Sequence, residues 1–291
     1  MKIVEVSKKD LIYNIGIIRS KIKEAGLDDN GEEREIIAVV KGNGYGLGLV
    51  EYTNFLIDHG FDFFAVSTAE EAVALRKAGI DKKILTLLST AVKEDLEALI
   101  DNNIIITIGS KEVGETANEM ARKKGKEIEA HIKIDTGMGR YGFIYTKPEE
   151  LLSTIKEFTN IKITGMFTHF SSAFNVDKTA VESQFKKFID IVEILRMNDI
   201  DYGLLHICNS EAFLRFPHMY LNAVRIGSAF VGLISDEEAG LKRVGIVKTK
   251  VAEIKTLPKG HNIGYGNTYT TKKETKVAII RSRICRWSEC R

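Results

Sequence analysis

Eight short apolar runs recur along the chain, and most are separated by segments long enough for a helix. They lie near residues 36, 61, 82, 103, 128, 161, 203 and 221. Runs that are apolar throughout are typical of parallel strands buried on both faces. Intervening segments such as AEEAVALRKAG and VESQFKKFIDIVEIL, and the opening segment 10–25, have the pattern of amphipathic helices. The chain is therefore predicted to form an α/β fold, a (β/α)8 TIM barrel.

A different pattern begins at about residue 240, where strand-like stretches follow one another without helices between them. VGIVKTKVAEIKTL, GHNIGYGNTY and KVAII are rich in strand-forming residues and are interrupted by glycines. We therefore expect the barrel to occupy residues 1–239. The beginning of a C-terminal β domain is expected in residues 240–291.

The composition narrows the choice of partners and compartment. Forty-two basic and forty acidic residues leave a formal charge of +2, without the basic stripe that binds nucleic acid. The first twenty residues lack the apolar core of a signal peptide, and no stretch resembles a membrane span. We expect a cytoplasmic protein without nucleic-acid or membrane partners. The three cysteines fit neither a disulfide framework nor a zinc site, so no metal is expected.

Active sites of such barrels lie on the loops that follow the carboxyl ends of the strands. The first of these loops, in VVKGNGYGLG, places Lys41 and Tyr45 among four glycines. A lysine that is desolvated at a barrel mouth acquires a lowered pKa and becomes a Schiff-base nucleophile. A solvated lysine at the end of a strand explains this segment equally well.

The segment HIKIDTGMGRYGF follows another predicted strand. It contains Lys133, Asp135 and Arg140, and its glycines permit a tight turn. The planar guanidinium of Arg140 is suited to orienting a carboxylate or a phenolic oxygen. The structural alternative is that Asp135 caps a helix and pairs with Arg140.

Three later strand ends supply the remaining polar candidates, which are His169, Asn209, Ser210, Arg225, Gly227 and Ser228. A lone histidine on an apolar strand is more often a core residue than a catalytic one. Loops after the seventh and eighth strands of such barrels commonly bind phosphate through backbone amides. Ser210, Gly227 and Ser228 occupy positions suited to that task.

Taken in order, these segments resemble the alanine racemase family, whose members are pyridoxal-phosphate-dependent racemases of fold type III. VVKGNGYGLG resembles the cofactor-lysine motif, and HIKIDTGMGRYGF resembles the substrate-arginine segment. MFTHF, HICNSEA and VRIGSAFVG resemble the segments around the cofactor, and GYGNTY resembles a strand pair of the second domain. One motif has little specificity, but six in the same order are specific. The resemblance runs from about residue 5 to residue 280, with small departures at Gly42, Gly44 and Leu47.

The resemblance implies interconversion of L-alanine and D-alanine by a homodimer, which supplies D-alanine for peptidoglycan. Lys41 would carry pyridoxal 5′-phosphate and move the α-proton on one face of the amino-acid substrate. Arg225 would face the pyridine nitrogen and, as a permanent cation, oppose its protonation. Arg140 would bind the phenolic oxygen and the substrate carboxylate. Of the other residues, Tyr45, Ser210, Gly227 and Ser228 would hold the phosphate, His169 and Asn209 would support Arg225 and the ring, and Lys133, carbamylated in some relatives, would orient Arg140.

The end of the chain departs from the family. After KVAII the family continues with a stretch similar to Pro-Val-Gly-Tyr-Ala-Asp-Gly, whose tyrosine is the second acid/base, whereas this chain reads RSRICRWSECR. For one choice of codons, a shift of one base in residues 282–291 restores the family pattern. We therefore expect a truncation or frameshift near residue 281 and impaired activity of the chain as written.

Three other interpretations stay open at this point. The same fold and cofactor are compatible with a racemase for serine, ornithine, lysine or a broad range of amino acids. A non-catalytic chain that binds the cofactor, including a truncation product, is also compatible with the sequence. A Schiff-base aldolase would explain Lys41 and a phosphate site, but it would not explain Arg225 or GYGNTY.

Overall fold

The computed structural model describes residues 2–234 and 239–280. The tail in which the frameshift is expected lies outside these residues. The described residues divide into two compact units, one within residues 9–243 and the other formed by residues 2–8 together with residues 244–280.

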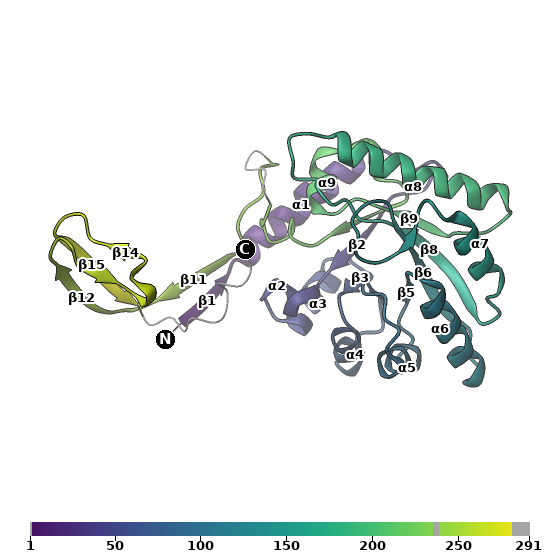
Figure 1. The fold of residues 1–291 in the computed structure, drawn as a ribbon, viewed down its shortest axis with the longest axis horizontal. Helices are drawn as coiled ribbons and strands as arrows, with labels where there is room; N and C mark the ends of the chain where they lie inside the picture. Colours follow the sequence, from purple (N-terminus) through teal and green to yellow (C-terminus); the bar gives the residue numbers. More distant parts are fainter. Residues whose placement is uncertain (1, 235–238, 281–291) are drawn as a thin grey trace. The chain divides into compact units, whose positions relative to one another are not determined.

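The larger unit is a barrel of eight parallel strands (Figure 1). In chain order the strands are β2 (Glu35–Val39), β3 (Phe63–Val66), β4 (Lys83–Thr86), β5 (Ile106–Ile108), β6 (Ile128–Asp135), β8 (Ile161–Phe167), β9 (Leu204–His206) and β10 (Ala223–Ile226). Their order around the sheet is β4-β3-β2-β10-β9-β8-β6-β5. A parallel bridge between Leu85 and Ile105 joins β4 to the start of β5. The (β/α)8 barrel predicted from the eight apolar runs is confirmed.

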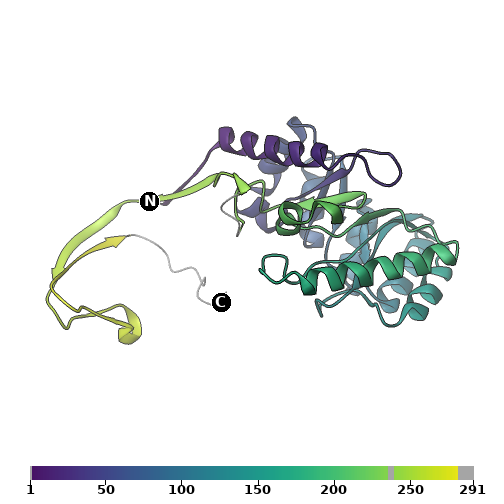
Figure 2. The ribbon, with the colours of Figure 1, turned by 90° about the horizontal axis from the view of Figure 1, so that it is seen from above.

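Helices connect most of the strands and lie on the outer side of the barrel (Figures 1 and 2). They are α1 (Lys8–Glu24), α3 (Leu49–Asp58), α4 (Ala69–Lys77), α5 (Lys93–Asp101), α6 (Lys111–Lys123), α7 (Pro148–Lys156), α8 (Thr179–Met197) and the short α9 (Ser210–Arg215). A two-residue strand, β7 (Phe143–Ile144), pairs with β6, and a 3₁₀ turn occupies Pro217–Met219. None of the described helices is long and apolar enough to cross a membrane.

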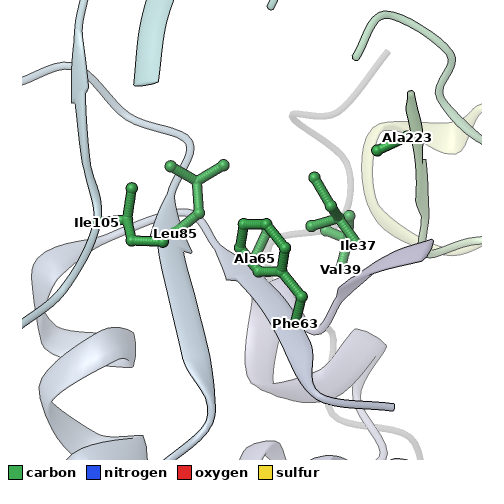
Figure 3. Close-up of a cluster of buried hydrophobic side chains, with 7 residues drawn as sticks. All are labelled: Ile37, Val39, Phe63, Ala65, Leu85, Ile105 and Ala223. Atoms are coloured by element: carbon green, nitrogen blue, oxygen red, sulfur yellow. The ribbon is translucent and has the colours of Figure 1, made fainter. Parts of the chain in front are cut away.

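The barrel interior is closed by apolar side chains that come from several strands. Figure 3 shows a buried cluster of this kind, formed by Ile37, Val39, Phe63, Ala65, Leu85, Ile105 and Ala223. On β2 and β3 the cluster contains alternate residues, and on β10 it contains Ala223, as expected when one face of each strand points inward. The positions that continue these inward faces toward the carboxyl ends are Lys41 and Arg225. The sequence thus directs both side chains toward the mouth of the barrel.

The smaller unit consists of short antiparallel strand pairs in its described residues. β1 (Lys2–Val6) pairs with β11 (Gly245–Thr249), and β12 (Val251–Leu257) pairs with β15 (Thr275–Ile280). β13 (Asn262–Ile263) and β14 (Tyr269–Thr270) flank a 3₁₀ turn at Tyr265–Asn267. The β domain predicted after the barrel is confirmed, and the first strand of the chain unexpectedly joins it.

Candidate active site

Lys41 emerges from β2 into a left-handed turn. Residues 42–45, which belong to the short element α2 (Lys41–Tyr45), have φ angles of 65°, 53°, 63° and 54°. Glycine adopts these angles without strain and asparagine tolerates them, which accounts for Gly42, Asn43 and Gly44. The turn directly follows Lys41, and the Lys41 side chain lines the cavity at the mouth of the barrel.

The Lys41 ammonium has no hydrogen-bond partner among the described residues. Desolvation by the surrounding protein and the nearby cation of Arg140 lower the pKa of Lys41. The carboxylate of Glu71 opposes this shift, whereas Arg225 adds to it. A lysine with a lowered pKa has a larger neutral fraction and is therefore a better nucleophile toward a carbonyl.

Tyr45 ends the left-handed turn and packs against the loop after β10. Its φ of 54° is uncommon for a residue with a side chain. A Cβ atom on Gly227 would overlap the Tyr45 hydroxyl, so this approach requires glycine. Burial raises the pKa of Tyr45 to about 12, although a hydrogen bond from the Ser228 backbone opposes the shift. The neutral phenol is thus fixed beside the Gly227–Ser228 backbone.

Asp135 shapes the turn that delivers Arg140. Its carboxylate accepts hydrogen bonds from the backbone N–H groups of Gly137, Met138 and Gly139, at 2.9, 2.8 and 2.9 Å. Burial raises the pKa of Asp135, but these backbone hydrogen bonds outweigh burial and hold the pKa below its usual value. Asp135 therefore caps a glycine-rich turn, and no ion pair with Arg140 is present among the described residues.

Lys133 lies deeper in the barrel, on β6. The side chain is buried, and its Nζ lies 4.4 Å from the centre of the Phe167 ring. Desolvation, followed by the cations of Arg225 and Arg140, holds the pKa of Lys133 well below its ordinary value. A buried amine among cations costs free energy in its charged form. The cations near Lys133 would therefore stabilise an anionic group at this position.

Arg225 on β10 is buried and held by its guanidinium hydrogen bonds. Nη1 donates to Nδ1 and to the carbonyl oxygen of His206, at 2.8 and 2.9 Å. Nη2 donates to the carbonyl oxygens of Thr168 and Ile207 and, at 3.2 Å, to Nδ1 of His169. Desolvation lowers the pKa of Arg225 to about 10, so the guanidinium stays charged at neutral pH.

Two buried histidines extend this hydrogen-bonded chain away from the cavity. Nε2 of His206 lies 2.9 Å from Nδ1 of His131. Desolvation and the Arg225 cation hold the pKa of His206 well below its usual value and lower that of His131 to about 3, so both rings are neutral. Since Arg225 donates to His206 Nδ1, the proton of His206 lies on Nε2 and is donated to His131. Gly165 leaves room for the His131 ring, because a Cβ there would lie 2.5 Å from it.

Ser210 organises the loop after β10. Its Oγ accepts hydrogen bonds from the N–H groups of Gly227 and Ala229, at 3.0 and 3.1 Å, while its own proton remains available for donation. Asn209 caps α9, because its Oδ1 accepts a hydrogen bond from the Ala212 N–H at 3.0 Å. The same side chain lines the cavity at the mouth, without a hydrogen bond to Arg225 among the contacts of the described residues.

These side chains line one cavity of about 380 Å³ at the carboxyl ends of the strands. The ten residues that the family resemblance assigned to the site all contribute to it, namely Lys41, Tyr45, Lys133, Arg140, His169, Asn209, Ser210, Arg225, Gly227 and Ser228, whereas Asp135 does not. Four of the ten are lysine or arginine, whereas Glu211 is the one carboxylate among the described residues of the lining. The cavity therefore favours an anionic ligand.

A larger cavity, of about 860 Å³, opens at the amino ends of the strands. Its lining includes seven carboxylate side chains, from Asp28, Asp29, Glu32, Glu33, Glu35, Asp62 and Asp201. None of the residues predicted to carry chemistry lies there. The smaller cavity is the candidate active site, because it combines a nucleophilic amine with cations and follows the carboxyl-end rule.

Several contributors to the site were not singled out from the sequence. Ser67, Leu87 and Tyr141 also line the cavity, and His131 and His206 form the chain behind Arg225. Ser67 directly follows a predicted strand, so the carboxyl-end rule could have found it, whereas Leu87 lies within the predicted run KKILTLL and follows β4 only in the structure. The pairing of His131 with His206 has no local signal, since it joins side chains of different strands across the barrel interior.

Known proteins match the chain over most of its length. The model of the alanine racemase N-terminal domain matches residues 7–235, and that of the C-terminal domain matches residues 244–282. The alanine racemase of Methanococcus maripaludis is 36% identical over 273 residues, which cover 92% of this chain and 73% of the relative.

Solved structures agree with this result. The alanine racemase of Bacillus anthracis with bound L-Ala-P is 31% identical, with a TM-score of 0.80, and the match covers 96% of this chain and 72% of that one. The alanine racemase of Bartonella henselae with covalently bound pyridoxal phosphate is 22% identical, has a TM-score of 0.79, and supports the fold. The chain belongs to the alanine racemase family.

Proposed function

We propose that this chain is an alanine racemase, an isomerase that interconverts L-alanine and D-alanine with pyridoxal 5′-phosphate as cofactor. The observation that carries the proposal is the cavity in which Lys41 meets Arg140, Lys133 and Arg225. The curated relatives that match most of the chain are alanine racemases.

The residues of the cavity fit the cofactor. The close approach of Tyr45 to Gly227 and the hydrogen bonds from Gly227 and Ala229 to Ser210 form a cradle of small and polar groups suited to a phosphate. Lys41, with its lowered pKa and no hydrogen-bond partner among the described residues, is suited to bind a carbonyl covalently. When bound, the cofactor supplies an electron sink for the carbanion at the substrate Cα.

The other residues are assigned by what they can do to charge and protons. Arg225, a buried cation held by His206 and His169, would keep the pyridine nitrogen unprotonated and so moderate the electron sink. Since Arg225 donates to Nδ1 of His169, the Nε2 of that ring carries the proton and can donate a hydrogen bond. Arg140 at the mouth would bind the substrate carboxylate, and Lys133 would orient Arg140. Lys41 would exchange the α-proton on one face of the substrate.

Covalent trapping on Lys41 tests the proposal directly. Borohydride reduction of the protein mixed with pyridoxal 5′-phosphate is expected to modify the peptide that contains Lys41, with loss of a visible absorption band. A Lys41→Met variant should show neither, while Lys186→Met on the exposed face of α8 should behave like the unchanged chain. Modification of other lysines with Lys41 left free would refute the assignment. Parallel assays with L-alanine, L-serine and L-ornithine would identify the substrate.

The same resemblance supports a proposal for the assembly and location of the protein. We propose a cytoplasmic homodimer, as expected for a family member that acts on a small amino acid. Light scattering of the purified protein at several concentrations tests this state, and a mass of one chain at all concentrations would count against it.

A further inference from the structure

The geometry points to Glu71 as a positioning residue for Lys41. This inference rests on the proposed function, since it assigns to Lys41 the role of binding the cofactor. Glu71 lies in the first turn of α4, and it does not line the cavity. Its carboxylate nevertheless contacts the turn that begins with Lys41.

The contacts are to backbone N–H groups. Oε1 of Glu71 accepts a hydrogen bond of 2.7 Å from Gly42 and a longer one of 3.3 Å from Asn43. These are the two residues that directly follow Lys41. In a left-handed turn successive N–H groups point to one side, which creates a site for an anionic oxygen. Glu71 fills that site from within the protein.

The second carboxylate oxygen ties the turn to the neighbouring strand. Oε2 of Glu71 accepts a hydrogen bond of 2.9 Å from the N–H of Ser67, a cavity-lining residue after β3. The Glu71 N–H in turn donates to Thr68 Oγ1 at 3.3 Å, which starts α4. One carboxylate therefore fixes the loops after β2 and β3 to each other and to a helix end. Hydrogen bonds to an ionised acceptor are stronger than neutral ones.

The position of Glu71 also has an electrostatic consequence. Its negative charge opposes the lowering of the Lys41 pKa by desolvation and Arg140. The other titratable side chains of the cavity are Tyr45, Lys133, Arg140, Tyr141, His169, Glu211 and Arg225. Of the charged groups that act on Lys41, Glu71 is the anion that also holds its backbone. The carboxylate both aims the amine and limits how far its pKa falls.

The experiment uses the full chain without added cofactor. It measures two quantities separately, the amide hydrogen exchange of the turn and the pH midpoint for acetylation of the Lys41 amine. Glu71→Ala is expected to speed amide hydrogen exchange at Gly42 and Asn43 by about 10- to 100-fold, as for the loss of a hydrogen bond to a charged group. It should also lower the pH midpoint for acetylation of Lys41 by acetic anhydride, because the opposing negative charge is removed. Glu71→Gln, which keeps the side-chain shape, should lower the midpoint with a smaller effect on exchange. It replaces the alanine variant in both measurements if that variant does not fold.

Two matched controls isolate the role of Glu71. Glu70→Ala removes a carboxylate from the same helix turn, and Thr68→Ala weakens the start of α4 without removing the contacts to Gly42 and Asn43. Both should leave exchange at Gly42 and Asn43 and the Lys41 midpoint as in the unchanged chain. Unchanged exchange or an unchanged midpoint in the folded Glu71 variants would overturn the inference.

Trapping of pyridoxal 5′-phosphate in the unchanged chain separates this inference from the proposed function. If Lys41 is not trapped while the Glu71 variants alter exchange and midpoint, the proposed function fails and the link between Glu71 and the Lys41 turn stands. If Lys41 is trapped and the variants change neither quantity, Glu71 is excluded as a positioning residue and the proposed function stands.

Discussion

Arg225 donates a hydrogen bond of 2.8 Å from Nη1 to Nδ1 of His206, and this contact fixes the proton of a neutral, buried imidazole on Nε2. Nδ1 of His131 accepts a hydrogen bond from this Nε2–H group at 2.9 Å. Among the described residues, the guanidinium is therefore held by neutral imidazoles and carbonyl oxygens and not by carboxylates. Its positive charge is not cancelled by an ion pair within the described barrel and is available to the cavity.

Replacement of Arg225 by glutamate tests the role of this cation through the ratio of transamination to racemisation. A carboxylate would favour protonation of the cofactor ring and strengthen its electron sink, so transamination should rise relative to racemisation. The measurement is the ratio of pyruvate to D-alanine formed from L-alanine with added cofactor, in a protein whose reading frame near residue 281 has been restored. Arg225→Lys, which retains a cation, should keep the ratio low. Equal ratios in the glutamate variant and the unchanged chain would rule out the assigned role.

Replacement of Gly227 by alanine should weaken cofactor binding. The new Cβ would overlap the Tyr45 hydroxyl, so the ring or the loop must move. Overpacking of this kind costs about 1–3 kcal/mol, which corresponds to roughly 5- to 150-fold in affinity if the cost falls on the bound state. Titration of the visible absorption band gives the affinity. Gly16→Ala on α1, where a Cβ meets nothing within 4 Å, is the control and should bind normally. Normal binding by both variants would argue against a phosphate site at Gly227.

Ser210→Ala should reduce stability as well as cofactor affinity. Two buried N–H groups, those of Gly227 and Ala229, would lose their acceptor. Leaving buried donors unsatisfied costs about 1–3 kcal/mol each. Urea unfolding measures the free-energy change, and Ser153→Ala, at an exposed position on α7, is the control, with a change below about 0.5 kcal/mol expected. A Ser210 variant as stable as its control would show that another group or water replaces the hydroxyl.

The buried histidines predict a loss of stability in acid. The pKa of His131 is about 3 in the folded protein, and the pKa values of His169 and His206 are also lowered, whereas unfolded histidine titrates near pH 6.5. Below pH 6.5 the unfolded chain therefore binds more protons, so the free energy of unfolding falls as the pH drops toward 3. Each histidine contributes up to about 1.4 kcal/mol per pH unit in this window.

Urea unfolding between pH 7.5 and 4.5 measures that slope. His131→Gln should make the slope shallower, whereas His218→Gln, at an exposed position, should not change it. A His131 variant with the slope of the unchanged chain would mean that the ring is already charged in the folded state.

The sequence by itself determined the strands of the barrel and the candidate residues at their ends. A parallel strand covered on both faces must be apolar throughout, so runs such as EIIAVVK predict their strands locally. Chain direction alone then places Lys41, Arg140 and Ser210 at the same end of the barrel. The glycines of VVKGNGYGLG likewise indicate a turn, although its left-handed form is visible only in the backbone angles.

The tertiary structure decided the contacts between segments that are distant in the chain. The hydrogen bonds from His206 to His131 and from the Gly42 N–H to Glu71, and the pairing of β1 with β11, depend on which strands become neighbours when the barrel and the β unit form. Hydrophobic periodicity specifies which face of a strand is buried, but it carries no information about which buried polar group lies opposite. The partners of these polar groups are set by strand order and register, and these emerge only when the strands assemble.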